Sequence, residues 1–196
     1  MRILKTLALG IALPVMATFS AQAATVDVVG NATTVTVTAD LAGLGLTPGT
    51  TGTATASGAD FTFGITGGSV NPVSGAALIE HDGSGVSLTA GKTTATVGDF
   101  LIDTAAGTVS GTLNGTVSDV VFFNLGASTD DGIELLISDA LGGALTSVFS
   151  APSLAGAQFG FANLDLELAP VPLPAGLPLL AAGLLGFGFV RRRQTA

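Results

Sequence analysis

The sequence predicts an all-β fold, an antiparallel β-sandwich or barrel with one short helix near the end of the domain. Glycine accounts for 28 of the 196 residues, about twice its usual share, and it separates short runs rich in threonine and valine. Such runs recur about every 8–12 residues without helical patterns between them, which is typical of short strands joined by tight turns. No fixed period holds over three copies, so the pattern favours a sandwich or barrel over a solenoid.

Alternation of apolar and polar residues places the individual strands. Phe61, Phe63 and Ile65 alternate with polar or small residues, so we expect their side chains to share one buried face. Residues 47–57 are low in complexity and predict either a mobile loop or an edge hairpin. The same alternation predicts further strands at 26–29, 35–38, 76–80, 86–90, 93–97, 100–103, 108–113, 117–125 and 133–137.

One helix of about three turns is predicted to follow these strands. Ser138 is a good N-cap, and Asp139 suits the first turn of a helix. Gly142 and Gly143 limit its expected length. Four apolar residues fall on one helix face: Leu141, Leu145, Val148 and Phe149.

A last strand is predicted over residues 159–168. Phe159 and Phe161 are in one phase of this strand, whereas the leucines at 164, 166 and 168 are in the other. This change of phase predicts a β-bulge at Ala162-Asn163.

Charge and composition exclude several function classes. Residues 24–170 contain one lysine and fourteen acidic residues, a net charge of −13, so we expect no nucleic-acid binding, which needs clustered lysine and arginine. The chain has no cysteine, hence no disulfide, thiolate nucleophile or cysteine metal site. It also has no tryptophan or tyrosine, the two rings on which glycan-binding sites usually rely. Phenylalanine is therefore the only remaining side chain of this kind on which a sugar could stack.

Catalytic residue types stand side by side only in His81-Asp82-Gly83-Ser84-Gly85. The members of a Ser-His-Asp triad meet from separate segments, whereas neighbours in a strand or turn point apart. The chain also lacks a G-x-S-x-G nucleophile elbow. We therefore expect an Asp-Gly turn after a strand ending at His81, no catalytic residue, and a protein that is not an enzyme.

Two groups of carboxylates near turns are weak candidates for calcium, which accepts oxygen ligands in flexible geometry. One group is Asp130, Asp131 and Glu134; the other is Asp99 with Asp103. Neither has the spacing of an EF-hand or of a calcium-binding β-roll. The expectation is solvated turn acids, with no metal and no cofactor.

The N-terminus has the three parts of a secretory signal peptide. Arg2 and Lys5 form a positive n-region, and residues 7–15 supply an apolar stretch too short to span a membrane. Ala21-Gln22-Ala23 matches an A-x-A cleavage site. Cleavage there would leave Ala24 as the first mature residue and implies export through the Sec machinery.

The C-terminus combines a proline-rich motif, an apolar run and a basic cluster in that order. The motif is Val171-Pro172-Leu173-Pro174-Ala175, an uncharged run continues to Val190, and Arg191-Arg192-Arg193 follows three residues before the end. Residues 173–190 just reach the length of about 18–20 apolar residues that a transmembrane helix needs. The arginines would stay on the cytoplasmic side, which places the rest of the chain outside.

This tail resembles the PEP-CTERM class of bacterial sorting signals, in its VPLPA variant. Leu173 stands where the main class has glutamate, which agrees with the variant. The resemblance covers only residues 171–193. It implies processing by exosortase, a membrane-embedded cysteine protease or transpeptidase of Gram-negative bacteria, and delivery of the protein from a membrane-anchored precursor to the cell surface or the extracellular space.

The predicted organisation is a signal peptide (1–23), a β-rich extracellular domain (24–169), and a tail (170–196) with a proline-rich neck, the sorting motif, a hydrophobic helix and the basic stop. The resemblance implies a surface or extracellular-matrix protein with a structural or adhesive role among exopolysaccharide or biofilm components. Two alternatives remain open: a secreted glycoside hydrolase that uses a pair of carboxylates, and a carrier of a small ligand in a β-barrel.

Overall fold

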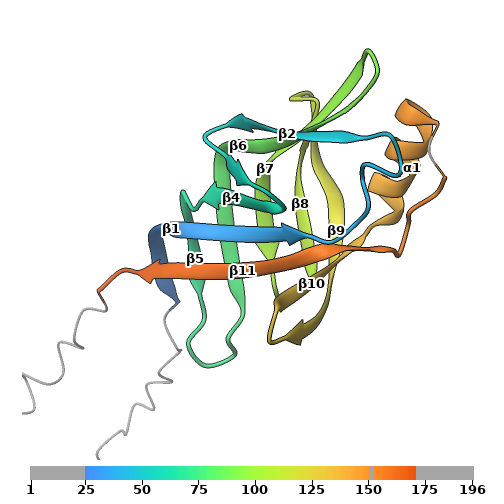
Figure 1. The fold of residues 1–196 in the computed structure, drawn as a ribbon. Helices are drawn as coiled ribbons and strands as arrows, with labels where there is room; N and C mark the ends of the chain where they lie inside the picture. The colour runs from blue at the N-terminus through green and yellow to red at the C-terminus, as the bar shows by residue number, and fades with distance from the viewer. Residues whose placement is uncertain (1–24, 151, 171–196) are drawn as a thin grey trace, which may run out of the picture.

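The chain folds into a strongly curved antiparallel sheet with one short helix at one end (Figure 1). A computed structural model describes residues 25–150 and 152–170. In this part of the chain the predicted antiparallel, mainly β fold with one short helix is confirmed. The eleven strands are β1 (Val26–Val37), β2 (Thr47–Gly52), β3 (Thr55–Ser57), β4 (Asp60–Gly64), β5 (Gly67–Val70), β6 (Ala77–Ala90), β7 (Thr93–Asp103), β8 (Thr108–Leu113), β9 (Val117–Thr129), β10 (Gly132–Ile137) and β11 (Gln158–Leu168).

Strand pairing forms a closed ring. From β11 the sheet runs through β10, β9, β8, β7, β6 and β5 to β1, and β1 pairs again with β11. The last pairing extends from Val28, opposite Leu168, to Val37, opposite Gly160. Because β1 pairs with both β5 and β11, the path of paired strands returns on itself, whereas β2 and β3 remain at edges of the sheet.

β1 and β6 are connected by strand pairing over only part of their length. At the start of both strands β5 lies between them and pairs with Val26 and Asp27 of β1 and with the first residues of β6. Farther along the two strands, β4 pairs with β1 and β3 pairs with β4, whereas β2 pairs with β6. Within the described residues, no pairing connects β2 with β3 or β4. The segment predicted as a loop or edge hairpin therefore forms two edge strands, but they pair with different partners.

The predicted Asp-Gly turn after His81 is wrong. β6 continues through this segment, and its register with β7 shifts between His81 and Gly85. Gly83 has a φ of 71° and Asp99, on β7, a φ of 50°, and a carboxylate oxygen of Asp99 accepts a hydrogen bond from the Gly83 N–H at 2.9 Å. The positive φ of Gly83 thus bends a long strand at a bulge instead of reversing the chain.

Glycine allows the sheet to bend sharply next to this bulge. Gly85 of β6 lies opposite Gly98 of β7, and a Cβ on either would meet backbone atoms of the facing strand. A Cβ on Gly111 of β8 would in turn meet the carbonyl of Gly98. These three glycines let adjacent backbones approach closely, as at the corners of barrels.

The helix α1 (Asp139–Phe149) begins after the predicted N-cap and has the predicted length of about three turns. Ser138 is its N-cap, and the Ser138 hydroxyl accepts a hydrogen bond from the Leu141 N–H at 3.0 Å. Leu141 and Leu145 are buried on the face that packs against β9 and β7. Figure 1 shows the helix at one end of the curved sheet, far from the start of β1 and the end of β11.

The bulge predicted at Ala162-Asn163 is wrong, because β11 pairs with β1 without interruption through these two residues. The register shift of β11 lies earlier, against β10, where Leu135 faces Gly160 but Leu136 faces Gln158. Phe159 is left without a partner on β10. From Gly160 onward the residues at even positions point inward, so Ala162 is buried and Phe161 is not.

Phenylalanines supply much of the core. Phe61, Phe63 and Ile65 are all buried, as predicted. The rings of Phe63 and Phe100 meet edge to face with centroids 5.2 Å apart, and Phe100 meets Phe122 in the same way at 6.1 Å. Such pairs contribute about 0.5–1.5 kcal/mol each beyond the burial of their area.

Candidate functional site: an apolar cavity inside the sheet

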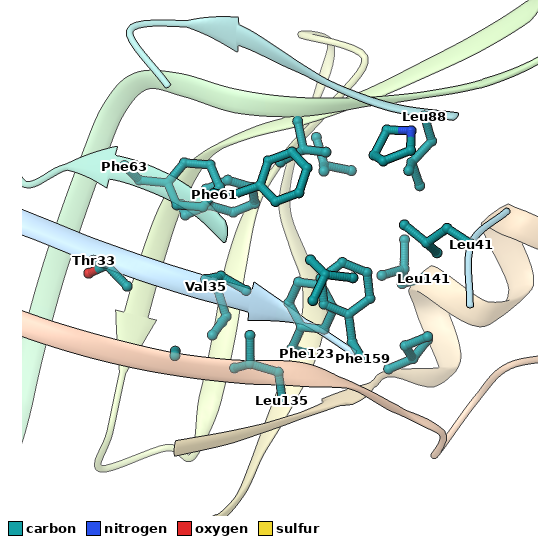
Figure 2. Close-up of a pocket in the computed structure, with 18 of the residues that line it drawn as sticks. Thr33, Val35, Leu41, Phe61, Phe63, Leu88, Phe123, Leu135, Leu141 and Phe159 are labelled. Atoms are coloured by element: carbon teal, nitrogen blue, oxygen red, sulfur yellow. The ribbon is translucent and has the colours of Figure 1, made fainter. Parts of the chain in front are cut away.

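A cavity of about 70 Å³ lies inside the closed sheet (Figure 2). Protein interiors contain few voids larger than a water molecule, and one water needs roughly 10–15 Å³ on the same kind of measure. The cavity is therefore several times larger than an ordinary packing defect.

The walls of the cavity come from nearly every part of the fold. Val35 of β1, Leu135 of β10 and Phe61 of β4 face one another across it, and Leu141 of α1 lies at one end (Figure 2). No lysine, arginine, aspartate or glutamate is among the lining residues in the part of the chain that the structure describes. The remaining lining residues with aromatic rings are Phe63, His81, Phe100, Phe123 and Phe159.

Two polar side chains border the cavity, and they bond to each other. Nε2 of His81 lies 2.8 Å from Oγ1 of Thr33, and Nδ1 of His81 lies 3.2 Å from the carbonyl oxygen of Phe100. A carbonyl only accepts, so the Nδ1–H donates to it, which leaves Nε2 as the acceptor for the Thr33 hydroxyl. The Thr33 oxygen points away from the hollow in Figure 2, so the pair adds no open polar group to the cavity.

His81 is held neutral by its surroundings. Only 1 % of its surface is exposed, and burial lowers the pKa of the imidazole below 6.5. The carbonyl of Phe100 and the charge of Asp82 act in the opposite direction, but burial prevails. This residue is thus a neutral hydrogen-bonding bridge between β6 and β1.

One side of the cavity lies at the division of the sheet between β1 and β2. Pro48, near the start of β2, is exposed, unlike the other residues that line the cavity. Leu41, from the segment that connects β1 to β2, is buried and also lines the cavity (Figure 2). No strand pairing joins β2 to β1 in the described structure. The connecting segment therefore covers the most accessible side of the cavity.

Two of the carboxylates singled out in the sequence, Asp99 and Asp103, accept hydrogen bonds from backbone N–H groups. The Asp103 carboxylate accepts hydrogen bonds from the N–H groups of Ala105 and Ala106, both at 2.9 Å. Asp99 accepts from Gly83, as described above. The partners of Asp103 lie in its own turn, and the partner of Asp99 lies on the neighbouring strand, β6.

Asp130, Asp131 and Glu134 lie at or beside the β9–β10 turn. The two aspartates are exposed, and the N–H of Asp131 donates to the Thr129 hydroxyl at 3.2 Å. Among the residues described, no group of three or more histidine and acidic side chains is arranged to hold a metal ion.

The predicted sorting and export residues lie outside the described residues. They comprise the signal-cleavage residues Ala21, Ala23 and Ala24, the motif Val171, Pro172, Leu173, Pro174 and Ala175, and the basic stop Arg191, Arg192 and Arg193. The predicted hydrophobic helix after the motif also lies outside them. Within residues 25–150 and 152–170, no helix is long and apolar enough to cross a membrane.

Sequence reasoning missed the pair of Thr33 and His81. These residues are 48 positions apart, and only closure of the sheet brings β1 and β6 within reach of each other. One local signal was available: His81 has the same strand phase as Ile79, which is fully buried. In a continuous strand the imidazole would point inward as well.

Comparisons with protein-family models, with curated proteins and with solved structures give no match for this chain.

Proposed function

We propose that the chain is the precursor of an exported surface or matrix protein of a Gram-negative bacterium, sorted by exosortase. The observation that carries the proposal is the order of the three parts at the C-terminus: Val171-Pro172-Leu173-Pro174-Ala175, an apolar run, and Arg191-Arg192-Arg193. The N-terminal signal pattern supports it, because a sorting signal of this kind acts on exported proteins.

The fold suits a domain attached at one end. The N–H of Ala169 donates to the carbonyl of Asp27 at 2.8 Å, so the first and last described residues lie side by side. Figure 1 shows β1 beginning and β11 ending at one end of the molecule, with the β6–β7 hairpin and α1 at the other. A tail that follows residue 170 would leave the hairpin and the helix farthest from the attachment point.

We propose a structural or adhesive role for this domain within exopolysaccharide or biofilm material. Its net charge of −13 over residues 24–170 keeps such a domain soluble and repels copies of itself at low ionic strength. The glycosidase alternative needs two carboxylates facing a substrate cleft, whereas the cavity described above has no carboxylate in its lining.

The test is a replacement of Pro172 and Pro174 by alanine in the full chain. Consecutive X-Pro units hold the backbone extended, which would present the motif to the enzyme instead of joining it to the helix that follows. We expect the double variant to be exported but to keep its tail through Ala196, whereas the wild-type protein loses the residues beyond the motif. The measurement is the mass of the surface or released protein.

Two further results bear on the same proposal. Replacing Arg191, Arg192 and Arg193 by glutamate should reduce retention of the precursor, because the basic cluster fixes its orientation. Two outcomes would contradict sorting by exosortase: a wild-type product that keeps its arginines, or a double-proline variant that is trimmed like the wild type. Either result would show that the protein is only a tail-anchored domain. A mature N-terminus other than Ala24 would contradict the predicted signal cleavage.

A further inference from the structure

The size of the interior cavity sets a limit on what it can hold. An engineered apolar cavity of roughly 150 Å³ in another protein stays dry and binds benzene or xenon. The cavity here measures about 70 Å³, roughly half as much. As it stands, it accommodates a guest smaller than benzene, or the end of a narrow chain.

The chemistry of the walls selects against polar guests. Apart from Thr33 and His81, all the side chains that line the cavity are apolar: valine, leucine, isoleucine, phenylalanine, Pro48 and Ala162 (Figure 2). The polar atoms of Thr33 and His81 are already bonded to each other. A guest with a hydroxyl, amide or charge would lose its bonds to water without replacement, which is costly in an apolar site. Water itself lacks the two to four polar partners that hold it in a buried site.

The position of Pro48 and Leu41 gives this cavity a route to solvent. Both residues line it, and they lie where β2 is not paired with β1. The segment between them includes Gly43 and Gly45, and Gly45 has a φ of 72°. Displacing this segment, which contains the buried Leu41 and Leu46, would open the interior without breaking the ring of paired strands.

We propose that the interior of the closed sheet is a binding site for a small hydrocarbon group without hydrogen-bonding atoms, reached between β1 and β2. The group is either a small apolar molecule enclosed completely or the methyl end of an alkyl chain whose remainder lies at Pro48. This site does not depend on how the protein is sorted. Failure of one proposal therefore leaves the other standing.

The experiment uses the full chain in phospholipid nanodiscs and observes its methyl groups by NMR. Xenon is the probe for a small enclosed guest, and decanoate is the probe for a chain end. We expect xenon to shift the methyl signals of Val35 and Leu135, which face the cavity, but not that of Val73, which is 79 % exposed. A shift with decanoate as well identifies a chain end, and a shift with xenon alone identifies an enclosed molecule.

Filling the cavity separates this site from partition into lipid. Val35→Phe should abolish the response of Leu135, and Val73→Phe is the matched control that should leave it unchanged. Because a phenylalanine at position 35 is a large insertion, Ala162→Val provides a milder second variant on the residue that faces Val35 across β1 and β11. No xenon response in the wild-type chain, or an equal response in folded filled variants, would overturn the proposal.

Discussion

Thr33 and His81 form the polar pair that borders the interior cavity. Both are almost completely buried, and each satisfies the polar group of the other. A neutral hydrogen bond contributes only about 0.5–1.5 kcal/mol, but leaving one partner buried and unpaired costs about 1–3 kcal/mol. Removing one side chain of the pair should therefore destabilise the fold mainly because the other would be left buried without a hydrogen-bond partner.

The lowered pKa of His81 predicts a loss of stability in mild acid. Below pH 6.5 the unfolded chain binds a proton at this residue, whereas the folded chain stays neutral until the pH reaches its lowered pKa. The free energy of unfolding should therefore fall as the pH decreases through this window, by at most about 1.4 kcal/mol per pH unit from this residue. Urea unfolding at a series of pH values below and above 6.5 measures it.

His81→Gln is the control for this pH dependence. Glutamine does not titrate, and its side-chain oxygen can accept the hydrogen bond from Thr33. The carboxylates are the same in both proteins, so the difference between the two pH profiles isolates His81. Parallel profiles for wild type and variant below pH 6.5 would show that the histidine does not set the acid sensitivity.

At the scale of elements, α1 contains two adjacent glycines with opposite environments. A Cβ on Gly142 would lie 2.9 Å from the backbone nitrogen of Ala155, whereas a Cβ on Gly143 would meet nothing within 4 Å. Gly142 thus allows the chain after the helix to pack against it. Gly143 only increases the flexibility of the unfolded chain.

Gly143→Ala should raise the free energy of unfolding by about 0.5–1 kcal/mol, the usual gain of alanine over glycine inside a helix. Gly142→Ala should lower it, because the contact with Ala155 outweighs the same helical gain. Urea unfolding of both variants measures the difference. Equal effects of the two substitutions would be inconsistent with this packing.

Local signals explain which elements the sequence could predict. The start of α1 follows from its N-cap, Ser138, and the limits of β8 follow from a short alternating run, so both are predicted correctly. β5 (Gly67–Val70) was missed, because Gly-Gly-Ser-Val has little strand propensity and depends on pairing with β1 and β6. β6 and β7 were each predicted as two shorter strands. Each in fact stays extended across a bulge, and the position of that bulge is fixed only by pairing with the neighbouring strand.

At the scale of the whole molecule, the cavity too depends on contacts between distant segments, which local sequence signals do not predict. The sequence predicts the buried face of Phe61, Phe63 and Ile65, since alternation is local. It does not predict the cavity that Phe61 and Phe63 line, because the volume of the cavity depends on how β1, β10 and α1 meet after the sheet closes. An unfilled cavity of about 70 Å³ corresponds to roughly 1.7 kcal/mol of lost stability at about 24 cal/mol per Å³.

Among the described residues, one buried hydrophobic cluster extends from Val28 to Ala162. The first and last strands, β1 and β11, pair with each other. The strand pairings that form the ring all lie within residues 26–168. The Asp103 carboxylate bonds to two backbone N–H groups of its own turn, which holds this turn without an ion.

Residues 24–170 alone should therefore fold as a soluble β-rich domain in the presence of EDTA and without a reductant. Circular dichroism in the far ultraviolet checks the secondary structure, and one cooperative thermal transition checks the packing. A ligand that binds only the folded state raises the transition temperature. Since we expect no calcium to bind, adding calcium should leave this temperature unchanged. A domain that is disordered in EDTA and folds when calcium is added would return Asp130, Asp131 and Glu134 to consideration as metal ligands. In that case the variant with all three replaced by asparagine or glutamine should lose the calcium response.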